Sequence, residues 1–148
     1  MNVKNKRGIS PVIATVILIA IAVAIAIAVA FWAAGLTGAF TRFEKLEITN
    51  AYAMGSSSTG WSVYVFYTNT GSSDATITDV FVNGKPPSSW SSGSVTVAQT
   101  LPISAKTGTS GSIVVSIKAG AGFTSGQTIE IKIHTASGTE YPKAVVIP

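Results

Sequence analysis

The chain has 148 residues, no cysteine and a formal net charge of +4. This length suits one ordinary domain, and the lack of cysteine excludes a disulfide framework and a thiolate metal site. Lys4, Lys6 and Arg7 lie before residue 9. The rest of the chain is therefore nearly neutral, and its basic pI is no argument for binding nucleic acid.

Residues 9–41 contain no charged side chain and consist mostly of Ile, Val and Ala. A membrane span needs about 20 apolar residues, and this run is longer. A strand of that length would leave its backbone unsatisfied in lipid. We therefore predict a helix over Pro11–Phe40, about 45 Å long at 1.5 Å per residue. Pro11 suits the first helical turn, and Ser10 stands where an N-cap is expected.

Large and small residues form separate rows along this predicted helix. Rows of branched or aromatic side chains make ridges that fit the grooves of a neighbour, and rows of alanine allow close approach. We predict that the helix packs against copies of itself in a filament core, with biased composition in a bare membrane anchor as the alternative. The predicted packing residues are Ile17, Ile21, Ile25, Val29, Ile19, Val23, Ile27 and Phe31 in ridges, and Ala20, Ala24, Ala28, Ala22, Ala26 and Ala30 in grooves.

The basic residues before the apolar run place the N-terminus in the cytoplasm and the remaining domain outside, by the positive-inside rule. A cleaved secretory signal has an apolar region of about 7–15 residues. The run in this chain is much longer, which disfavours that interpretation and favours a segment that stays with the protein.

The sequence KRGISPVIA at residues 6–14 closely resembles the N-terminal signature of archaeal type IV pilins, which carry a class III signal peptide. The resemblance implies that a membrane-embedded prepilin peptidase cuts after the glycine and leaves the apolar segment on the mature protein. Bacterial type IV pilins have a Glu at the fifth mature position, where this chain has Ile13. That difference favours the archaeal kind. The implied processing residues are Lys6, Arg7, Gly8 and Ile9.

The resemblance also implies partners and a location. The subunit would wait in the cytoplasmic membrane and then join identical subunits in a helical homopolymer, driven by a pilus assembly ATPase and its membrane platform. The product would be an extracellular adhesion filament on the archaeal cell surface. Two alternatives remain open: a single-span anchor displaying a β-sandwich that binds a ligand such as a sugar, and an archaellin of a motility filament.

Beyond residue 41 the sequence is rich in Ser, Thr and Gly, with alternating apolar residues. Short alternating segments separated by turns about every 8–12 residues predict an antiparallel sandwich of about seven strands, and Asn83-Gly84 is a strong turn signal. The predicted fold class is thus α+β, with an N-terminal helix and a β-sandwich that the resemblance implies is immunoglobulin-like. The predicted parts are a leader at 1–8, the helix at 9–41 and an extracellular domain at 42–148. The predicted strands are Leu46–Met54, Trp61–Thr68, Ala75–Val82, Ser94–Leu101, Ser112–Lys118, Gln127–His134 and Thr139–Ile147.

Residues suited to catalysis or metal binding are scattered. His134 falls on the outward face of its predicted strand, and zinc needs three or four convergent ligands. No combination of nucleophile, base and orienting group is evident. We therefore expect no enzyme activity, cofactor or metal, and no nucleic-acid partner because Lys and Arg are not clustered. Four aromatic residues are candidates for stacking sugars or bases, with core packing as the alternative: Trp61, Trp90, Tyr64 and Tyr67.

Glycans are a further expected partner. The sequence has no N-x-[ST] acceptor, so N-linked sugars at that motif are excluded. Hydroxyl-rich stretches are candidates for O-linked sugars, with simple solvation of loops as the alternative. The candidate acceptors are Ser56, Ser57, Ser58, Thr59, Ser88, Ser89, Ser91, Ser92 and Ser94.

Overall fold

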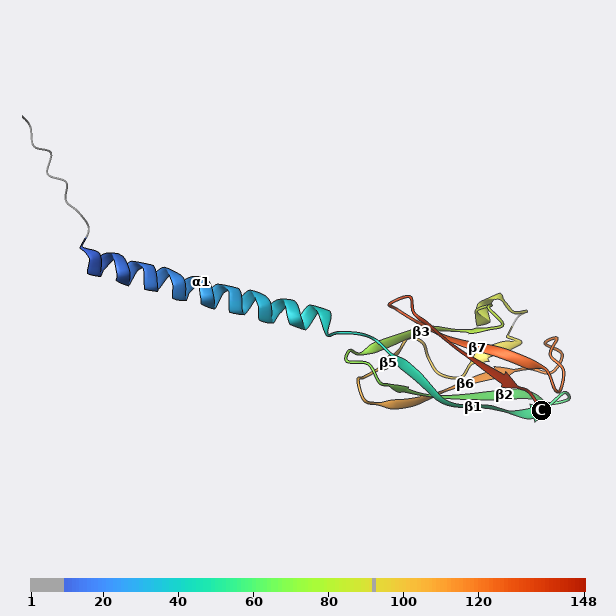
Figure 1. The fold of residues 1–148 in the computed structure, drawn as a ribbon. Helices are drawn as coiled ribbons and strands as arrows, with labels where there is room; N and C mark the ends of the chain where they lie inside the picture. The colour runs from blue at the N-terminus through green and yellow to red at the C-terminus, as the bar shows by residue number, and fades with distance from the viewer. Residues whose placement is uncertain (1–9, 92) are drawn as a thin grey trace, which may run out of the picture. The chain divides into compact units, whose positions relative to one another are not determined.

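The computed structural model describes residues 10–91 and 93–148. The chain divides into two compact units, Met1–Thr41 and Arg42–Pro148. The first contains one helix and the second contains the strands (Figure 1). Each unit is described by itself.

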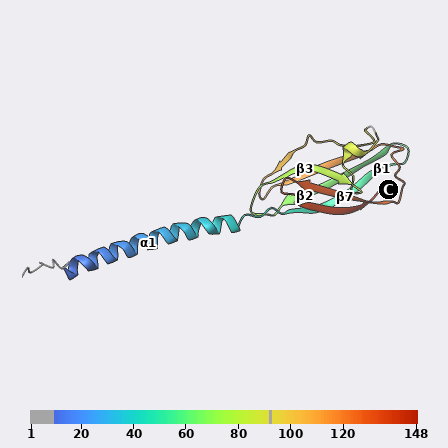
Figure 2. The ribbon, with the colours of Figure 1, turned by 90° about the horizontal axis from the view of Figure 1, so that it is seen from above.

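The helix α1 spans Pro11–Phe40, as predicted, and is continuous along its length (Figure 2). Pro11 occupies its first position. Ser10 stands at the N-cap, but its side chain makes no capping hydrogen bond, and only its carbonyl accepts the N–H of Ala14, at 3.1 Å. The expected side-chain cap is therefore wrong. At the other end the N–H of Thr41 donates to the carbonyl of Thr37 at 3.2 Å.

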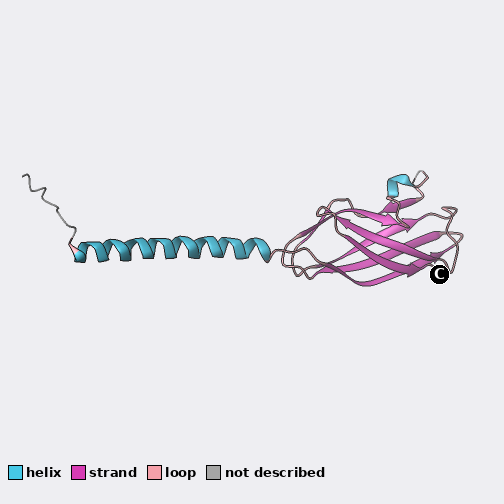
Figure 3. Cartoon of the chain, turned by 45° about the horizontal axis from the view of Figure 1, so that its top comes forward, coloured by secondary structure: helices cyan, strands magenta, loops and turns pink. Residues whose placement is uncertain are grey.

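The second unit is a sandwich of two four-stranded antiparallel sheets, which confirms the predicted fold class (Figure 3). It has eight strands rather than about seven, because the short strand β5 was missed. The first sheet has the order β1-β2-β6-β4 and the second has the order β5-β3-β7-β8. The strands are β1 (Leu46–Ser56), β2 (Gly60–Asn69), β3 (Ala75–Val82), β4 (Val95–Val97), β5 (Ile103–Ala105), β6 (Ser110–Ile117), β7 (Thr128–Thr135) and β8 (Glu140–Val146), with a 3-10 turn η1 (Pro87–Ser89).

Apolar residues from alternate positions of both sheets fill the space between them. In β7, Ile129, Ile131 and Ile133 are fully buried, and the residues between them lie on the outer face. Val63 and Val65 of β2 are equally buried on the facing sheet. Because burying such a side chain contributes about 1.5–3 kcal/mol, and because every residue of this core lies within 42–148, the second unit has a hydrophobic core of its own.

A β-bulge in β1 changes which of its side chains face the core. The pairing of β1 with β2 shifts between Ile48 and Asn50. Simple alternation from Leu46 would place Asn50, Tyr52 and Met54 on the core side. One extra residue reverses the alternation beyond the bulge, so Asn50, Tyr52 and Met54 are exposed.

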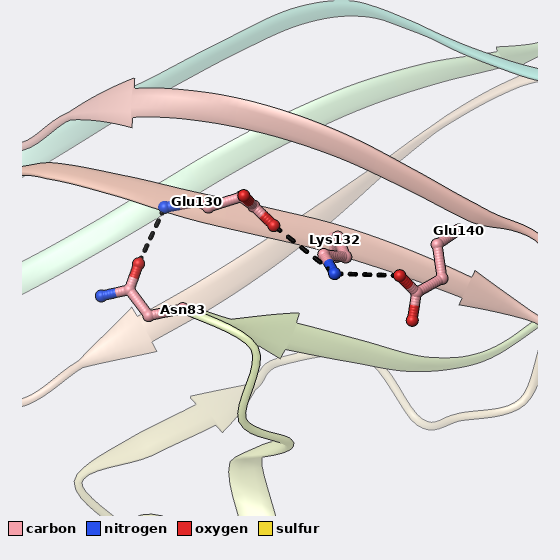
Figure 4. A network of polar contacts seen from close by, with 4 residues as sticks. All are labelled: Asn83, Glu130, Lys132 and Glu140. Atoms are coloured by element: carbon pink, nitrogen blue, oxygen red, sulfur yellow. Dashed lines mark hydrogen bonds and ion pairs between the residues drawn. The ribbon is translucent and has the colours of Figure 1, made fainter.

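The outer face of the second sheet carries charged groups (Figure 4). Lys132 Nζ lies 2.9 Å from Glu140 Oε2 and 3.7 Å from Glu130 Oε1. The hydrogen bond to Glu140 raises the pKa of Lys132 above its usual value. The predicted Asn83-Gly84 turn is confirmed, with positive φ at both residues, and Asn83 Oδ1 accepts the backbone N–H of Glu130 at 2.9 Å. The turn is thereby fixed to the neighbouring strand.

A loop after β2 holds the segment through which the chain enters the sandwich. The carbonyls of Phe43 and Lys45 each accept two hydrogen bonds from N–H groups of residues 70–73, at 2.9–3.2 Å. A Cβ added to Gly71 would lie 2.6 Å from Lys45 N and Phe43 O. Only glycine therefore allows the two backbones to approach this closely.

Asn69 fixes that loop from inside. Its side chain is fully buried. Nδ2 donates to the carbonyls of Ser73 at 3.0 Å and Ala105 at 2.8 Å, and Oδ1 accepts the N–H of Gly71 at 3.0 Å. One amide thus joins the loop to β5 and satisfies three backbone groups, as buried polar groups require.

We expect Asn69→Ala to lower the free energy of unfolding of the sandwich by about 3 kcal/mol, because the carbonyls of Ser73 and Ala105 lose the buried amide and the N–H of Gly71 keeps only the carbonyl of Lys45. Denaturant unfolding of the full chain in detergent, followed by the fluorescence of the buried Trp61, measures the change. Asn50→Ala, at an exposed position, is the matched control and should be nearly neutral. Equal effects of the two variants would contradict this role for Asn69.

Candidate functional site

The helix α1 presents apolar side chains on all sides. Every α1 side chain that the structure describes is exposed. The exposed fraction is 49% for Ile17 and 77% for Phe31. A helix that is hydrophobic all round belongs in a membrane or in a protein core. The apolar surface of the 30-residue helix α1 therefore has to be covered, either by lipid or by other protein chains.

The polar groups of α1 are satisfied within the helix. Thr15 Oγ1 donates to the carbonyl of Val12 at 2.8 Å, and Thr37 Oγ1 donates to the carbonyl of Ala33 at 2.9 Å. Backbone groups are paired by the helix itself, which is what a segment in hydrocarbon requires. Residues Pro11–Gly38 are long and apolar enough to cross a membrane.

The predicted ridges and grooves all lie on α1. Ile17, Ile21, Ile25 and Val29 follow one another at intervals of four, so they project from the same side of the helix. The alanines at 20, 24 and 28 form a neighbouring row with small side chains. A second chain that brought its ridge into this groove could approach closely. Their packing in a filament core stays a prediction.

The predicted processing residues and the candidate O-glycosylation sites are placed differently by the structure. The processing residues Lys6, Arg7, Gly8 and Ile9 lie outside the described residues, as does Ser92. Ser57, Ser58 and Thr59 occupy the exposed turn between β1 and β2, and Ser88 and Ser89 lie in η1 and are exposed. Ser56, Ser91 and Ser94 are also at the surface in part or whole. Their glycosylation stays a prediction.

Three of the four aromatic candidates serve packing. Trp61 and Tyr67 are buried in the core, where Trp61 Nε1 donates to the carbonyl of Pro148 at 3.1 Å and burial raises the pKa of the Tyr67 phenol. Trp90 is half-buried, with its ring centroid 5.1 Å from that of Phe123. Only Tyr64 lies on an outer face.

Tyr64 belongs to an aromatic cluster that the sequence did not reveal. Its ring is stacked on Tyr52, with centroids 5.2 Å apart, and Phe66 is 6.0 Å from Tyr52. The alternation of β2 places Tyr64 and Phe66 on one face, which was a usable signal. Tyr52 could not be found in the same way, because the β1 bulge reversed its side.

The described residues offer no metal site. Within 10–91 and 93–148, no group of three His, Cys, Asp or Glu side chains lies close enough to hold an ion. His134 is half-buried, and its Nδ1 lies 3.1 Å from Thr78 Oγ1. Its ring also contacts Phe81, with centroids 5.5 Å apart. These contacts give His134 a packing role on the outer face of the second sheet.

No protein-family model and no curated protein matches the chain. The solved structures that are similar to it include the following three. The archaellum periplasmic stator protein FlaG from Sulfolobus acidocaldarius is 22% identical, with a TM-score of 0.46 over 69% of this chain and 99% of that one. The apo PCuAC domain from PmoF1 is 17% identical, with a TM-score of 0.48 over 72% of this chain and 98% of that one. The Iho670 flagellar-like filament is 13% identical, with a TM-score of 0.41 over 93% of this chain and 98% of that one. Since all three TM-scores are below 0.5, none of these similarities decides the function.

We expect the variant Ala24→Arg to remain inserted in the membrane. The large apolar residues between Val12 and Phe31 together favour insertion by about 5 kcal/mol, whereas one central Arg costs about 3 kcal/mol. Carbonate extraction of cell membranes, followed by detection of the chain in the pellet, measures this. Release of Ala24→Arg into the soluble fraction would contradict the claim that the apolar residues of α1 favour insertion by more than one Arg opposes it.

Proposed function

We propose that this chain is a structural subunit of an archaeal type IV pilus that polymerises through α1 into a cell-surface adhesion filament. One observation carries the proposal: α1 is apolar and exposed on every side, with rows of alanine beside rows of branched residues. A bare anchor needs apolar character only. A helix surrounded by copies of itself also needs a surface whose ridges and grooves interlock.

The free energy that favours assembly comes from close packing of the helices rather than from removing apolar surface from water. Before assembly α1 lies in lipid, which is as apolar as the helices that replace it, so transfer between the two releases little hydrophobic free energy. Close contact over many turns supplies dispersion energy, about 0.1–0.2 kcal/mol for each atom pair. Alanine rows increase the number of such pairs because they let the helix axes come closer.

Cleavage after Gly8 would permit assembly in this scheme. It removes Lys4, Lys6 and Arg7, whose unpaired burial in a filament core costs several kcal/mol for each ion. The prepilin peptidase, the assembly ATPase and its membrane platform are the partners that this proposal requires. The role is structural rather than enzymatic, and the second unit is carried as the exposed part of each subunit.

We expect Ala24→Arg to abolish filaments although it still inserts in the membrane. A guanidinium in the alanine groove is buried without a partner in the filament core, whereas in lipid it can reach the interface through its long side chain. Electron microscopy of sheared cell-surface material measures filament yield. Ala136→Arg adds the same charge at an exposed position of the sandwich and is the matched control. Normal filaments built from Ala24→Arg would contradict the burial of the alanine groove in a filament core, and absence of filaments from the native chain as well would favour a single-span anchor.

We expect filaments to contain a chain that begins at Ile9. Mass spectrometry of the purified fibre measures its N-terminus. Gly8→Val should block the cut, because a branched side chain replaces the small residue at the cleavage point, and the uncut chain should accumulate in the membrane. Finding residues 1–8 in mature filaments would contradict the role given to cleavage.

A further inference from the structure

Three aromatic side chains lie together on the outer face of the sheet β1-β2-β6-β4. Tyr52 and Tyr64 are paired across β1 and β2, with ring planes 23° apart, and the planes of Tyr52 and Phe66 are 26° apart. We call these three rings the aromatic platform. Strand β1 is the edge strand of its sheet, and Tyr52 is 39% exposed.

A groove of about 500 Å³ adjoins the aromatic platform through Tyr64 and Met54. Its volume falls within the range of about 300–1,000 Å³ that is usual for ligand sites. Hydroxyl groups of Thr59, Ser62 and Ser116 line it. Lys118 adds one ammonium group.

We propose that the aromatic platform and this groove bind a neutral oligosaccharide. A sugar ring has an apolar face of C–H bonds, which fits the electron-rich face of an aromatic ring. Its edge carries hydroxyl groups, which pair with the donor and acceptor hydroxyls of serine and threonine. Platform and groove lie side by side, so they suit neighbouring units of a sugar chain rather than one monosaccharide.

The charge of this face excludes nucleic acid as the favoured ligand. Bases also stack on aromatic rings, but single-stranded nucleic acid requires a positively charged groove along its backbone. Among the described residues, Lys118 is the one cation in the groove. Serine, threonine and valine fill most remaining outer positions of β2 and β6 beside the rings. The surroundings therefore match an uncharged, hydroxyl-rich ligand.

The exposed aromatic area is also too small to explain a subunit interface by itself. An aromatic side chain of this kind can bury about 150–250 Å². Tyr64 and Phe66 are half-buried, so the platform leaves on the order of 200 Å² uncovered. A stable protein interface buries about 800 Å² on each partner. The platform thus fits a few sugar rings better than a second copy of this chain.

The groove lies at the end of the sandwich remote from Arg42, and the aromatic platform lies nearer the middle of β1 and β2. Strand β1 begins at Leu46 and runs to Ser56, next to Gly55 and Gly60 of the groove. The C-terminus lies at that same end (Figure 1). The use of this site for adhesion rests on the proposed function, because it requires the chain to be part of a cell-surface filament. Sugar binding by the sandwich itself does not depend on polymerisation.

The test uses the purified full chain in lipid nanodiscs, one chain in each disc. Calorimetry measures binding of neutral hexasaccharides of glucose, mannose or N-acetylglucosamine. We expect at least one of them to bind. Tyr52→Ala should weaken that binding about tenfold or more, whereas Tyr52→Phe should bind as the native chain does because the ring is kept. Phe81→Ala removes a half-buried aromatic ring on the outer face of the other sheet and is the matched control, expected to bind normally.

The proposal is wrong if none of the three hexasaccharides binds, or if Tyr52→Ala binds as the native chain does. It is equally wrong if Tyr52→Ala leaves sugar binding intact but breaks filaments, because the face would then be a contact between copies. Near-ultraviolet circular dichroism of each variant confirms that the sandwich is folded. Loss of sugar binding in variants that still form filaments supports the site and leaves the proposed function standing.

Discussion

A helix that has no charged side chain and is apolar on every side is the constraint on which this molecule depends. In an aqueous environment α1 would expose large apolar residues along its whole length, at about 25 cal/mol for each Å². The chain must therefore keep α1 in lipid or among other helices at every stage. The sandwich meets the opposite requirement. Its apolar residues are packed between the two sheets, and hydroxyl and charged groups remain at the surface. One chain thus contains two units that are stable in different solvents.

The two outer faces of the sandwich differ in chemistry. The second sheet carries Lys132, which pairs with both Glu130 and Glu140. Exposed ion pairs of this kind contribute little stability and keep that face hydrated. The first sheet has aromatic rings and hydroxyl groups at the corresponding positions. The proposed oligosaccharide site lies on this less charged face.

Much of the fold could be predicted because hydrophobic periodicity is a local property. The bounds of α1 and of β3 followed directly from composition, alternation and turn residues. Strand β5 has three residues, too few for alternation to show, and only its pairing with β3 defines it. The bulge in β1 depends on register with β2, which no local pattern records. The predicted strand ended one residue before Asn69, whose role appears only where β5 and the loop after β2 meet around its amide.

The arrangement of β1 has a mechanical consequence. Strand β1 receives the chain at Leu46 and is paired with β2 along nearly its whole length, while the C-terminus lies near Trp61 at the other end of the sandwich. A force that pulls on residues 42–45 against that far end acts along the strand. The ladder bonds between β1 and β2 then share the tension in shear, rather than opening one after another as in a zipper. A domain fastened in this way resists stretching most strongly along the direction of its own first strand.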